Sequence, residues 1–341
     1  MFFLGEELSS STAKETSLRE EIAKLRQEER NISFLPLFLT YFCLVCLFFA
    51  SWRLEAIHFV WMIPIMGVLQ YYIVISGHEA VHKTLCYPKV WNEFFGVLGQ
   101  ALVGVNFTAY RLQHIDHHQA KTHLQDPDSH IYMRVMRVRK GWRRFVYLTF
   151  GTLIEIVIKI RQKGSGGYGT DRKIKPKIRK NMKRDSLLVI LAQLAIMGLS
   201  YVCLGGLPFS TGFSWLDVGF GLVWCYAWMW IVPLFGITVF LNRCRIVIEH
   251  GLALQIHGEQ DESIRIPTID ILSHPVERFF FAPFLFNYHC AHHLFMSVPH
   301  YNLPKLHALL EERQHKGYHH IRGGYVKALV RAMNTPKIES I

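Results

Sequence analysis

Long apolar runs divide the chain into stretches that fit a lipid bilayer and stretches that do not. A helix needs about 20 mostly apolar residues to cross the hydrocarbon core. Four runs meet this length: Ile32–Trp52, Ala56–Gly77, Leu187–Leu207 and Trp215–Leu241. The pattern therefore predicts an all-α integral membrane protein with four transmembrane helices, of which the first two form a tight hairpin.

Two shorter apolar segments do not fit this pattern of spans. Phe94–Phe107 is too short to cross a bilayer comfortably, and a crossing there would put the basic loop that follows it on the wrong side. This segment is expected to be re-entrant or interfacial. Phe145–Ile160 is bracketed by Arg and Lys, which is typical of a helix that lies along the membrane surface.

The N-terminal region has a different character. The apolar start Met1–Leu4 is too short for a signal peptide, and the charged segment Glu6–Arg30 that follows predicts a surface helix. We expect three parts: an N-terminal cytoplasmic helix over 1–31, a membrane domain with a helical cytoplasmic cap over 32–307, and a C-terminal cytoplasmic tail over 308–341.

The charge distribution gives the orientation of these parts. Lys and Arg number 38 against 26 Asp and Glu, a net charge of +12. The cations concentrate in residues 110–185, whereas the loop 205–214 has none. By the positive-inside rule the N-terminus, the long middle loop and the segment after Leu241 are cytoplasmic. No nucleic-acid-binding motif accompanies the charge, so topology is the better explanation of it.

The seven cysteines are scattered, and several lie inside predicted spans. Neither a disulfide framework nor a four-thiolate metal site fits this distribution. Any metal chemistry must therefore come from other residue types.

Histidines supply that possibility. Of the 19 in the chain, eight fall in three short boxes, all on the predicted cytoplasmic side. The boxes are His78 and His82, then His114, His117 and His118, then His289, His292 and His293. Residues three or four apart share one face of a helix, so each box can direct two or three imidazoles at one point. Imidazole is a strong ligand for first-row transition metals.

Eight imidazoles exceed what one ion takes up, so two metal ions are the economical interpretation. His250, on the helix that leaves the fourth span, is a ninth candidate. Metal-bound histidines usually donate their second ring N–H to a carboxylate or carbonyl, which fixes the tautomer. The candidates for this role are Glu79, Asp116, Asp126, Asp128 and Glu249.

The remaining histidines are not expected to bind metal. His58 lies at the outer end of the second span, and the C-terminal segment contains His315, His319 and His320. Surface or structural roles are expected for His123, His130, His274, His300 and His307. Cys290 lies inside a box but faces away from its histidines if that stretch is helical.

The order H-x3-H, H-x2-H-H, H-x2-H-H on one face of four spans resembles the membrane fatty-acid desaturase superfamily, over about His78 to His307. Residues 77–85, 277–283 and 287–307 look like its bacterial acyl-lipid branch. The resemblance implies a mushroom-shaped helical fold and a diiron centre at the cytoplasmic end. It implies metal ligands at His78, His82, His114, His117, His118, His289, His292 and His293, with His250 as the family's extra histidine. It also implies electrons from ferredoxin or cytochrome b5.

Two features keep the substrate open. Acyl-CoA desaturases of the superfamily have an Asn four residues before the extra histidine, where this chain has Ile246. The stretch from His117 to His123, with Asp126 and Asp128 after it, also looks similar to carotenoid ketolases and hydroxylases. His274-Pro275 is followed by Val276 and not by the glycines of the cytochrome b5 haem motif, so the donor is expected to be a separate protein.

The function expected from these observations is O2-dependent oxidation of an unactivated C–H bond by two Fe ions. An aliphatic C–H bond offers no acid–base handle, so a metal and O2 as co-substrate must attack it. The first hypothesis is desaturation of a fatty acyl chain in a membrane lipid or acyl thioester. The alternative is a hydroxylase or ketolase of a carotenoid or other lipid.

Two classes without this chemistry fit less well. A zinc-binding membrane hydrolase needs only one metal with an open position. A metal transporter would place polar groups at mid-membrane, but these spans are almost free of charge. The basic face, with Arg134–Arg144 and Lys173–Arg184, is expected either to bind an acidic electron donor or only to set topology and contact anionic lipid.

Overall fold

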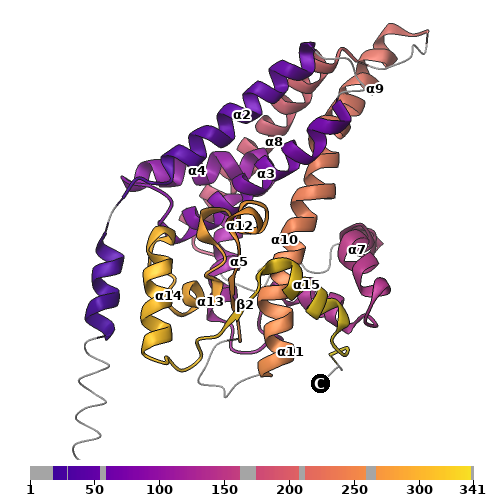
Figure 1. The fold of residues 1–341 in the computed structure, drawn as a ribbon. Helices are drawn as coiled ribbons and strands as arrows, with labels where there is room; N and C mark the ends of the chain where they lie inside the picture. The colour runs from indigo at the N-terminus through magenta and orange to yellow at the C-terminus, as the bar shows by residue number, and fades with distance from the viewer. Residues whose placement is uncertain are drawn as a thin grey trace, which may run out of the picture.

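The computed structural model describes residues 18–28, 30–53, 59–161, 174–206, 212–258 and 266–338. In these residues the chain is helical except for two three-residue strands and the connecting segments (Figure 1). His58 and most of residues 6–30 lie outside the described residues. All seven cysteines are free thiols.

Four helices are long and apolar enough to cross a membrane, as predicted. They are α2 (Phe34–Arg53), α3 (Phe59–His82), α8 (Pro176–Leu204) and the continuous helix Ser214–His257. Large side chains on these helices, such as Phe38, Trp61 and Val202, are more than half exposed on the protein. Water would penalise such surfaces, whereas lipid would not.

The helix of the fourth span continues past Leu241 to His257, so it carries His250 as expected. It is built from α9 (Ser214–Tyr226), η2 (Ala227–Ile231), η3 (Leu234–Thr238), α10 (Val239–Ile246), η4 (Val247–Leu252) and α11 (Ala253–His257). The segments η2, η3 and η4 are π-helical turns. Wide turns of this kind are frequent at functional sites, and η4 carries His250.

The short apolar segment predicted to be re-entrant forms helix α4 (Lys89–Leu102). It packs against α3 and α8 and ends among the spans. Gln193 of α8 donates to the carbonyls of Ala101 at 2.7 Å and Leu102 at 2.9 Å, and Trp230 donates to Leu102 at 2.9 Å. A helix end inside a bilayer needs such partners, because lipid cannot satisfy its carbonyls.

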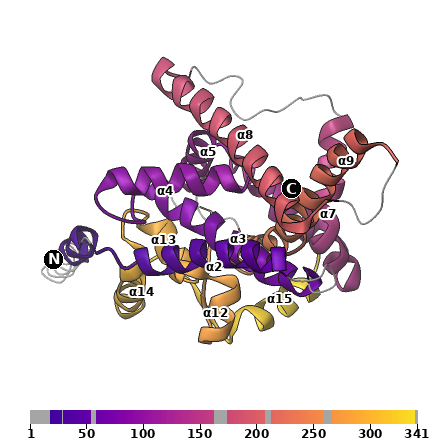
Figure 2. The same cartoon turned by 90° about the horizontal axis from the view of Figure 1, so that it is seen from above.

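The other helices form a cap at the end of the bundle where α3 finishes (Figures 1 and 2). They are α5 (Phe107–Gln119), α6 (Ser129–Arg137), α7 (Trp142–Arg161), α12 (Pro275–Phe281), η5 (Pro283–Leu285), α13 (His289–Leu294), η6 (His300–Asn302), α14 (Leu303–Glu312) and α15 (Gly324–Asn334). Strand β1 (Asp270–Leu272) pairs in parallel with β2 (His320–Arg322). This pairing brings residues 320–322 beside the segment that leads into α12 and α13.

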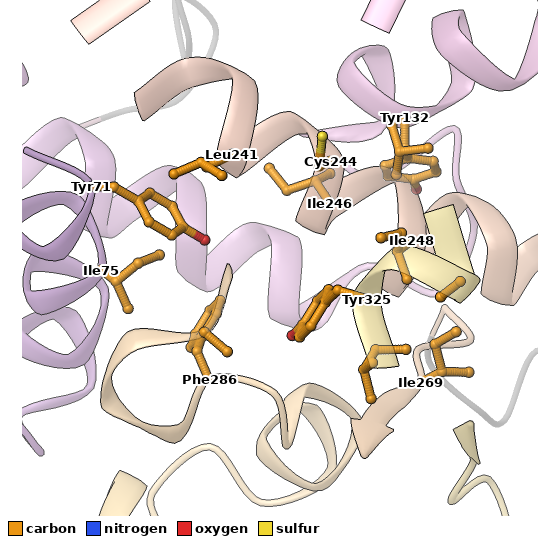
Figure 3. Packing of buried hydrophobic residues seen from close by; sticks show 14 of the residues in the cluster. Tyr71, Ile75, Tyr132, Leu241, Cys244, Ile246, Ile248, Ile269, Phe286 and Tyr325 are labelled. Carbon is orange, nitrogen blue, oxygen red and sulfur yellow. The ribbon is translucent and has the colours of Figure 1, made fainter. Parts of the chain in front are cut away.

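One hydrophobic core connects the cap to the bundle (Figure 3). Its fully buried members include Tyr71 of α3, Ile248 of η4, Tyr325 of α15 and Phe286, which follows η5. The division at residue 307 remains a prediction, but residues 308–338 contribute directly to this core. Helical residues 18–27 also pack on the cap, with Ile22 in contact with the leucines of α14.

Arg144 corrects one expectation about the basic face. Its side chain is fully buried and donates to the carbonyls of Met136 at 2.9 Å, Val138 at 2.8 Å and Ala332 at 2.6 Å. These acceptors lie at the ends of α6 and α15, where carbonyls lack helical partners. Arg144 therefore joins α6, α7 and α15 and is not available to a docking partner.

Candidate metal centre

Nine histidines from four separate elements meet in the interior of the cap. The last turns of α3 carry the first box, α5 the second, α13 the third, and η4 carries His250. They divide into two clusters in which the ligand atoms lie within 4.8 Å of one another. The first cluster contains His78, His82, His114, His118 and His292, and the second contains His117, His250, His289 and His293.

The two clusters adjoin. The rings of His118 and His293, one from each cluster, stack with centroids 4.2 Å apart. The sequence predicted that these nine histidines would gather. It did not predict this division, which mixes residues of the same box.

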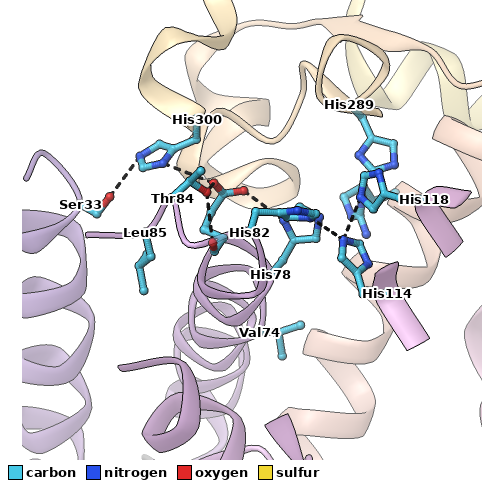
Figure 4. Close-up of polar contacts among 12 residues, drawn as sticks. Ser33, Val74, His78, His82, Thr84, Leu85, His114, His118, His289 and His300 are labelled. Atoms are coloured by element: carbon cyan, nitrogen blue, oxygen red, sulfur yellow. Dashed lines mark hydrogen bonds and ion pairs between the residues drawn. The ribbon is translucent and has the colours of Figure 1, made fainter. Parts of the chain in front are cut away.

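Spacing within the clusters fits ligation of a metal ion. The Nε2 atoms of His82 and His114 are 2.9 Å apart, and those of His114 and His118 are 3.0 Å apart (Figure 4). Those of His250 and His289 are 2.9 Å apart. Adjacent ligands at about 2.1 Å from one metal ion and at right angles to each other would be about 3.0 Å apart. The geometry therefore matches imidazoles that converge on a common point.

Buried nitrogen atoms without partners support the same conclusion. The Nε2 atoms of His78 and His292 are buried and have no hydrogen-bond partner in the protein. Buried polar atoms are normally hydrogen-bonded. A bound metal ion would satisfy both atoms, so the residues present fit a metal site.

Electrostatics keeps most of these imidazoles in the form that binds metal. Burial, followed by the neighbouring histidines, lowers the pKa of His114, His118, His289 and His293 well below the ordinary value. The same causes lower the pKa of His292 to about 3. Neutral imidazole is the ligand form, so these groups are ready for a metal at neutral pH.

Glu79 orients the first cluster. Its Oε1 lies 3.0 Å from His78 Nδ1, so the imidazole is held with Nε2 directed at the cluster (Figure 4). Thr84 donates to Glu79 Oε2 at 2.9 Å, and His300 Nδ1 lies 3.5 Å from the same oxygen. His300 is itself 3.3 Å from Ser33 Oγ, which ties the start of α2 to this network. His300 is thus structural, one of the two roles expected for it.

Asp126 plays the corresponding part for the second cluster. Its Oδ1 lies 2.7 Å from His117 Nδ1, and Tyr132 donates to Oδ2 at 2.8 Å. Burial acts to lower the pKa of His117, but the hydrogen bond and charge of Asp126 outweigh it and raise that pKa. Asp128 Oδ2 is 3.9 Å from His117 Nδ1, and its Oδ1 accepts from Gln113.

Glu249 lies one residue before His250 in η4 and faces the third box. Its Oε2 is 3.6 Å from His289 Nδ1 and accepts a 2.5 Å hydrogen bond from Arg245. Its Oε1 accepts from Tyr325 at 2.8 Å. The guanidinium of Arg245 also lies 4.2 Å from the ring centroid of Phe286. Arg245, Phe286 and Tyr325 were not identified from the sequence, since none of them lies in a histidine motif.

Asp116, the fifth acidic candidate, is half-buried on α5. The described histidines outside the three boxes and η4 lie outside both clusters. His307 contacts Tyr318, His319 stacks on His257 with centroids 3.8 Å apart, and His274 caps α12. Cys290 Sγ faces Gly317 and the backbone N–H of His319, away from the clusters, as predicted.

Asp270 is a further residue that the sequence analysis missed. Its Oδ1 accepts the backbone N–H groups of Cys290 at 2.6 Å and Ala291 at 3.1 Å. Tyr318 donates to its Oδ2 at 2.7 Å. The carboxylate therefore holds the first turn of α13, the helix of the third box. A single acid inside the otherwise apolar run 269–272 is the signal that could have identified it.

A cavity of about 220 Å³ adjoins both clusters. Five of the nine histidines contribute to its wall, together with apolar and polar side chains. The other lining residues are Val74, Ile75, Gln100, Val105, Tyr110, Gln113, Asp128, Ile131, Asn242, Arg245, Ile246 and Phe286. Ile246, where acyl-CoA desaturases have Asn, gives the cavity an apolar wall at that point.

Comparisons with known proteins agree with this site. The model of the family described as fatty acid desaturase matches residues 57–325, which include all nine clustered histidines. An sn-1 acyl-lipid omega-3 desaturase (ferredoxin) from Nostoc sp. (strain 36) is 22% identical over 245 residues, 70% of this chain and 63% of that protein. The match thus spans less than two thirds of that relative's length. Since the family model covers well over half of the chain, this protein belongs to the fatty acid desaturase family.

Proposed function

We propose that this protein is an O2-dependent diiron oxidoreductase that desaturates a fatty acyl chain of a membrane lipid. The observation that carries the proposal is the pair of adjoining buried clusters, with five and four imidazoles, beside a cavity. The first cluster would hold one iron and the second the other. Glu79, Asp126 and Glu249 would fix the orientation of His78, His117 and His289.

The two irons, when bound, would supply with O2 the oxidant that removes hydrogen from an unactivated C–H bond. The protein's own residues do the rest. Ile75, Ile246 and Phe286 give the cavity apolar walls that hold an alkyl chain and exclude water. Arg245 is paired with Glu249, so its charge is neutralised beside an apolar substrate.

The proposal also covers the electron donor and the orientation of the protein in the membrane. The Nostoc relative is named as a ferredoxin-type desaturase, and we propose a ferredoxin or cytochrome b5-type donor for this chain. The active site and both termini would be cytoplasmic, and the membrane would be the inner or plasma membrane if the host is a bacterium. The excess of cations in residues 110–185 supports this orientation.

Hydroxylation or ketolation of a carotenoid or other lipid is the alternative outcome. The polar side chains in the cavity wall, including Gln100, Gln113 and Asn242, could receive a polar group of such a substrate. Desaturation and hydroxylation share the initial loss of hydrogen, so the product decides between them.

Two measurements test the proposal. Elemental analysis of the purified protein should find about two irons and little zinc, because nine imidazoles without thiolates suit two iron sites better than one tetrahedral zinc site. Lipid mass spectrometry of a host with and without the gene should show acyl chains that have lost two hydrogens. One zinc without iron would contradict the diiron proposal, and products that have gained oxygen would favour the alternative.

A further inference from the structure

A second cavity, a groove of about 490 Å³ between α4 and α8, lies away from the histidines. One face of each helix forms its walls. The lining residues are Val90, Glu93, Phe94, Val97, Leu98 and Ala101 of α4, and Arg184, Leu188, Leu191 and Ala192 of α8. No histidine of the metal clusters is among them, so this groove is separate from the cavity at the metal centre.

One wall of the groove belongs to a candidate membrane span. Leu188, Leu191 and Ala192 lie on α8, and neighbouring Leu187 and Leu194 on the same helix are exposed. In a bilayer such a surface meets acyl chains and not water. An alkyl chain can fill an open apolar groove there without loss of hydrogen bonds.

The two charged lining residues, Glu93 and Arg184, lie toward one end of the groove. Glu93 is paired with Arg111 at 2.7 Å, so its charge is compensated. Arg184 contacts Asp185 at 2.6 Å, but Asp185 is buried and also accepts from the backbone and hydroxyl of Thr108 at 2.9 and 2.6 Å. The side chain of Arg184 remains 47% exposed.

Further cations lie along the chain just before Arg184. The first turns of α8 and the residue before it present exposed positive side chains: Lys175, Lys177, Arg179, Lys180 and Lys183. Over residues 174–186 the only acid is Asp185, which is already engaged by Arg184 and Thr108. An apolar groove therefore ends at a surface with a clear excess of positive charge.

We infer that the groove between α4 and α8 binds an anionic membrane phospholipid, with one acyl chain against Leu188 and Leu191 and its phosphate near Arg184. A basic cluster at a membrane surface attracts anionic headgroups, at about 1 kcal/mol per Lys or Arg, or about fivefold in affinity for each. An acidic protein could use the same cations but would not fill an apolar groove at membrane depth. The inference does not depend on the proposed reaction.

A steric variant with a matched control tests the acyl-chain part. Ala192→Trp places a large ring in the groove, whereas Ala195→Trp places the same ring on an exposed position of α8 that does not line it. The iron-loaded protein in detergent would be titrated with phosphatidylglycerol, and retained lipid counted by native mass spectrometry. Ala192→Trp should weaken retention of one lipid at least fivefold, and Ala195→Trp should not. Equal retention by both variants overturns the inference.

The headgroup part is tested by exchange of the lipid and of one cation. Phosphatidylcholine with the same acyl chains should bind several-fold more weakly than phosphatidylglycerol. Arg184→Gln should lower phosphatidylglycerol retention about fivefold, whereas Arg179→Gln, farther from the groove, should change it less. Equal retention of the two lipids overturns the inference. An effect of Arg184→Gln only on turnover with an acidic electron donor also overturns it, in favour of a protein partner. Unchanged iron content and melting temperature would show that each variant is folded.

Discussion

Tyr325 donates its phenolic O–H to Glu249 at 2.8 Å, although 76 residues separate them in the sequence. Both side chains are fully buried. The other carboxylate oxygen of Glu249 accepts from Arg245 and lies 3.6 Å from His289. Helix α15 is thereby connected to the helix of His250 and to the third histidine box, so the C-terminal residues are part of the candidate metal centre.

Loss of this hydrogen bond should weaken the metal centre. Tyr325→Phe leaves a buried oxygen of Glu249 without its donor, which costs about 1–3 kcal/mol, and frees Glu249 to move relative to His289. Second-layer substitutions of this kind typically cost about 10–100-fold in metal affinity or activity, and we expect about tenfold. Iron content and turnover measure it. Tyr72→Phe, which removes only a bond to the Phe279 carbonyl, should leave both unchanged, and equal behaviour of the two variants would contradict this role.

Asp270 should matter for the stability of the third box. Asp270→Ala leaves the N–H groups of Cys290 and Ala291 buried without an acceptor, at a cost of about 1–3 kcal/mol for each unsatisfied group. We expect a lower melting temperature and reduced iron content. Asp270→Asn keeps an oxygen that can accept from both N–H groups, so it should recover much of the stability. If the two variants have the same melting temperature and iron content, Asp270 does not act by accepting hydrogen bonds from these two N–H groups.

The spans were predictable from the sequence because length and hydropathy alone define them. The helix that leaves the fourth span and carries His250 was also expected, but the way it buries Arg243 and Arg245, which interrupt the apolar pattern after Leu241, was not. The structure buries both arginines by giving them acceptors: Arg243 donates to the Leu148 carbonyl of α7 at 3.0 Å, and Arg245 donates to Glu249 of the same continuous helix at 2.5 Å. The contact of Arg243 is tertiary and leaves no periodic signal.

The members of the candidate site were predictable for a similar reason. Spacings of three and four residues place each box on one helix face, whatever the rest of the fold does. The division into five and four imidazoles depends on how α3, α5, η4 and α13 are placed relative to one another, which spacing does not specify. Partners such as Asp270 and Tyr325 come from distant segments, and Arg144 was assigned to the surface because an unpaired charge is rarely buried.

Acid should destabilise the metal-free protein. His114, His118, His289 and His293 have pKa values lowered well below the unfolded value of about 6.5, and that of His292 is about 3. The unfolded chain then binds more protons than the folded chain below about pH 6.5, so stability is present above that pH and is lost as pH falls toward 3. Thermal unfolding after chelation should show this decline, and His292→Gln should make it shallower. A melting temperature independent of pH between 7 and 4 would contradict the neutral state of the clusters.

Alanine substitutions should separate metal ligands from the other histidines. A methyl group cannot replace a bound imidazole without opening a coordination position, and in a two-metal site one such loss should remove most of the activity. His82→Ala, His117→Ala and His292→Ala should each abolish product and lower iron content while the protein still inserts in the membrane. His315→Ala and His320→Ala should leave both nearly unchanged, since these residues lie outside both clusters.

The sharpest comparison uses one continuous helix: His250→Ala removes a member of the second cluster, whereas His257→Ala, two turns farther along, removes a ring that stacks on His319. We expect iron loss only for His250→Ala, and full iron with wild-type turnover in that variant would remove His250 from the ligand set and leave the other eight.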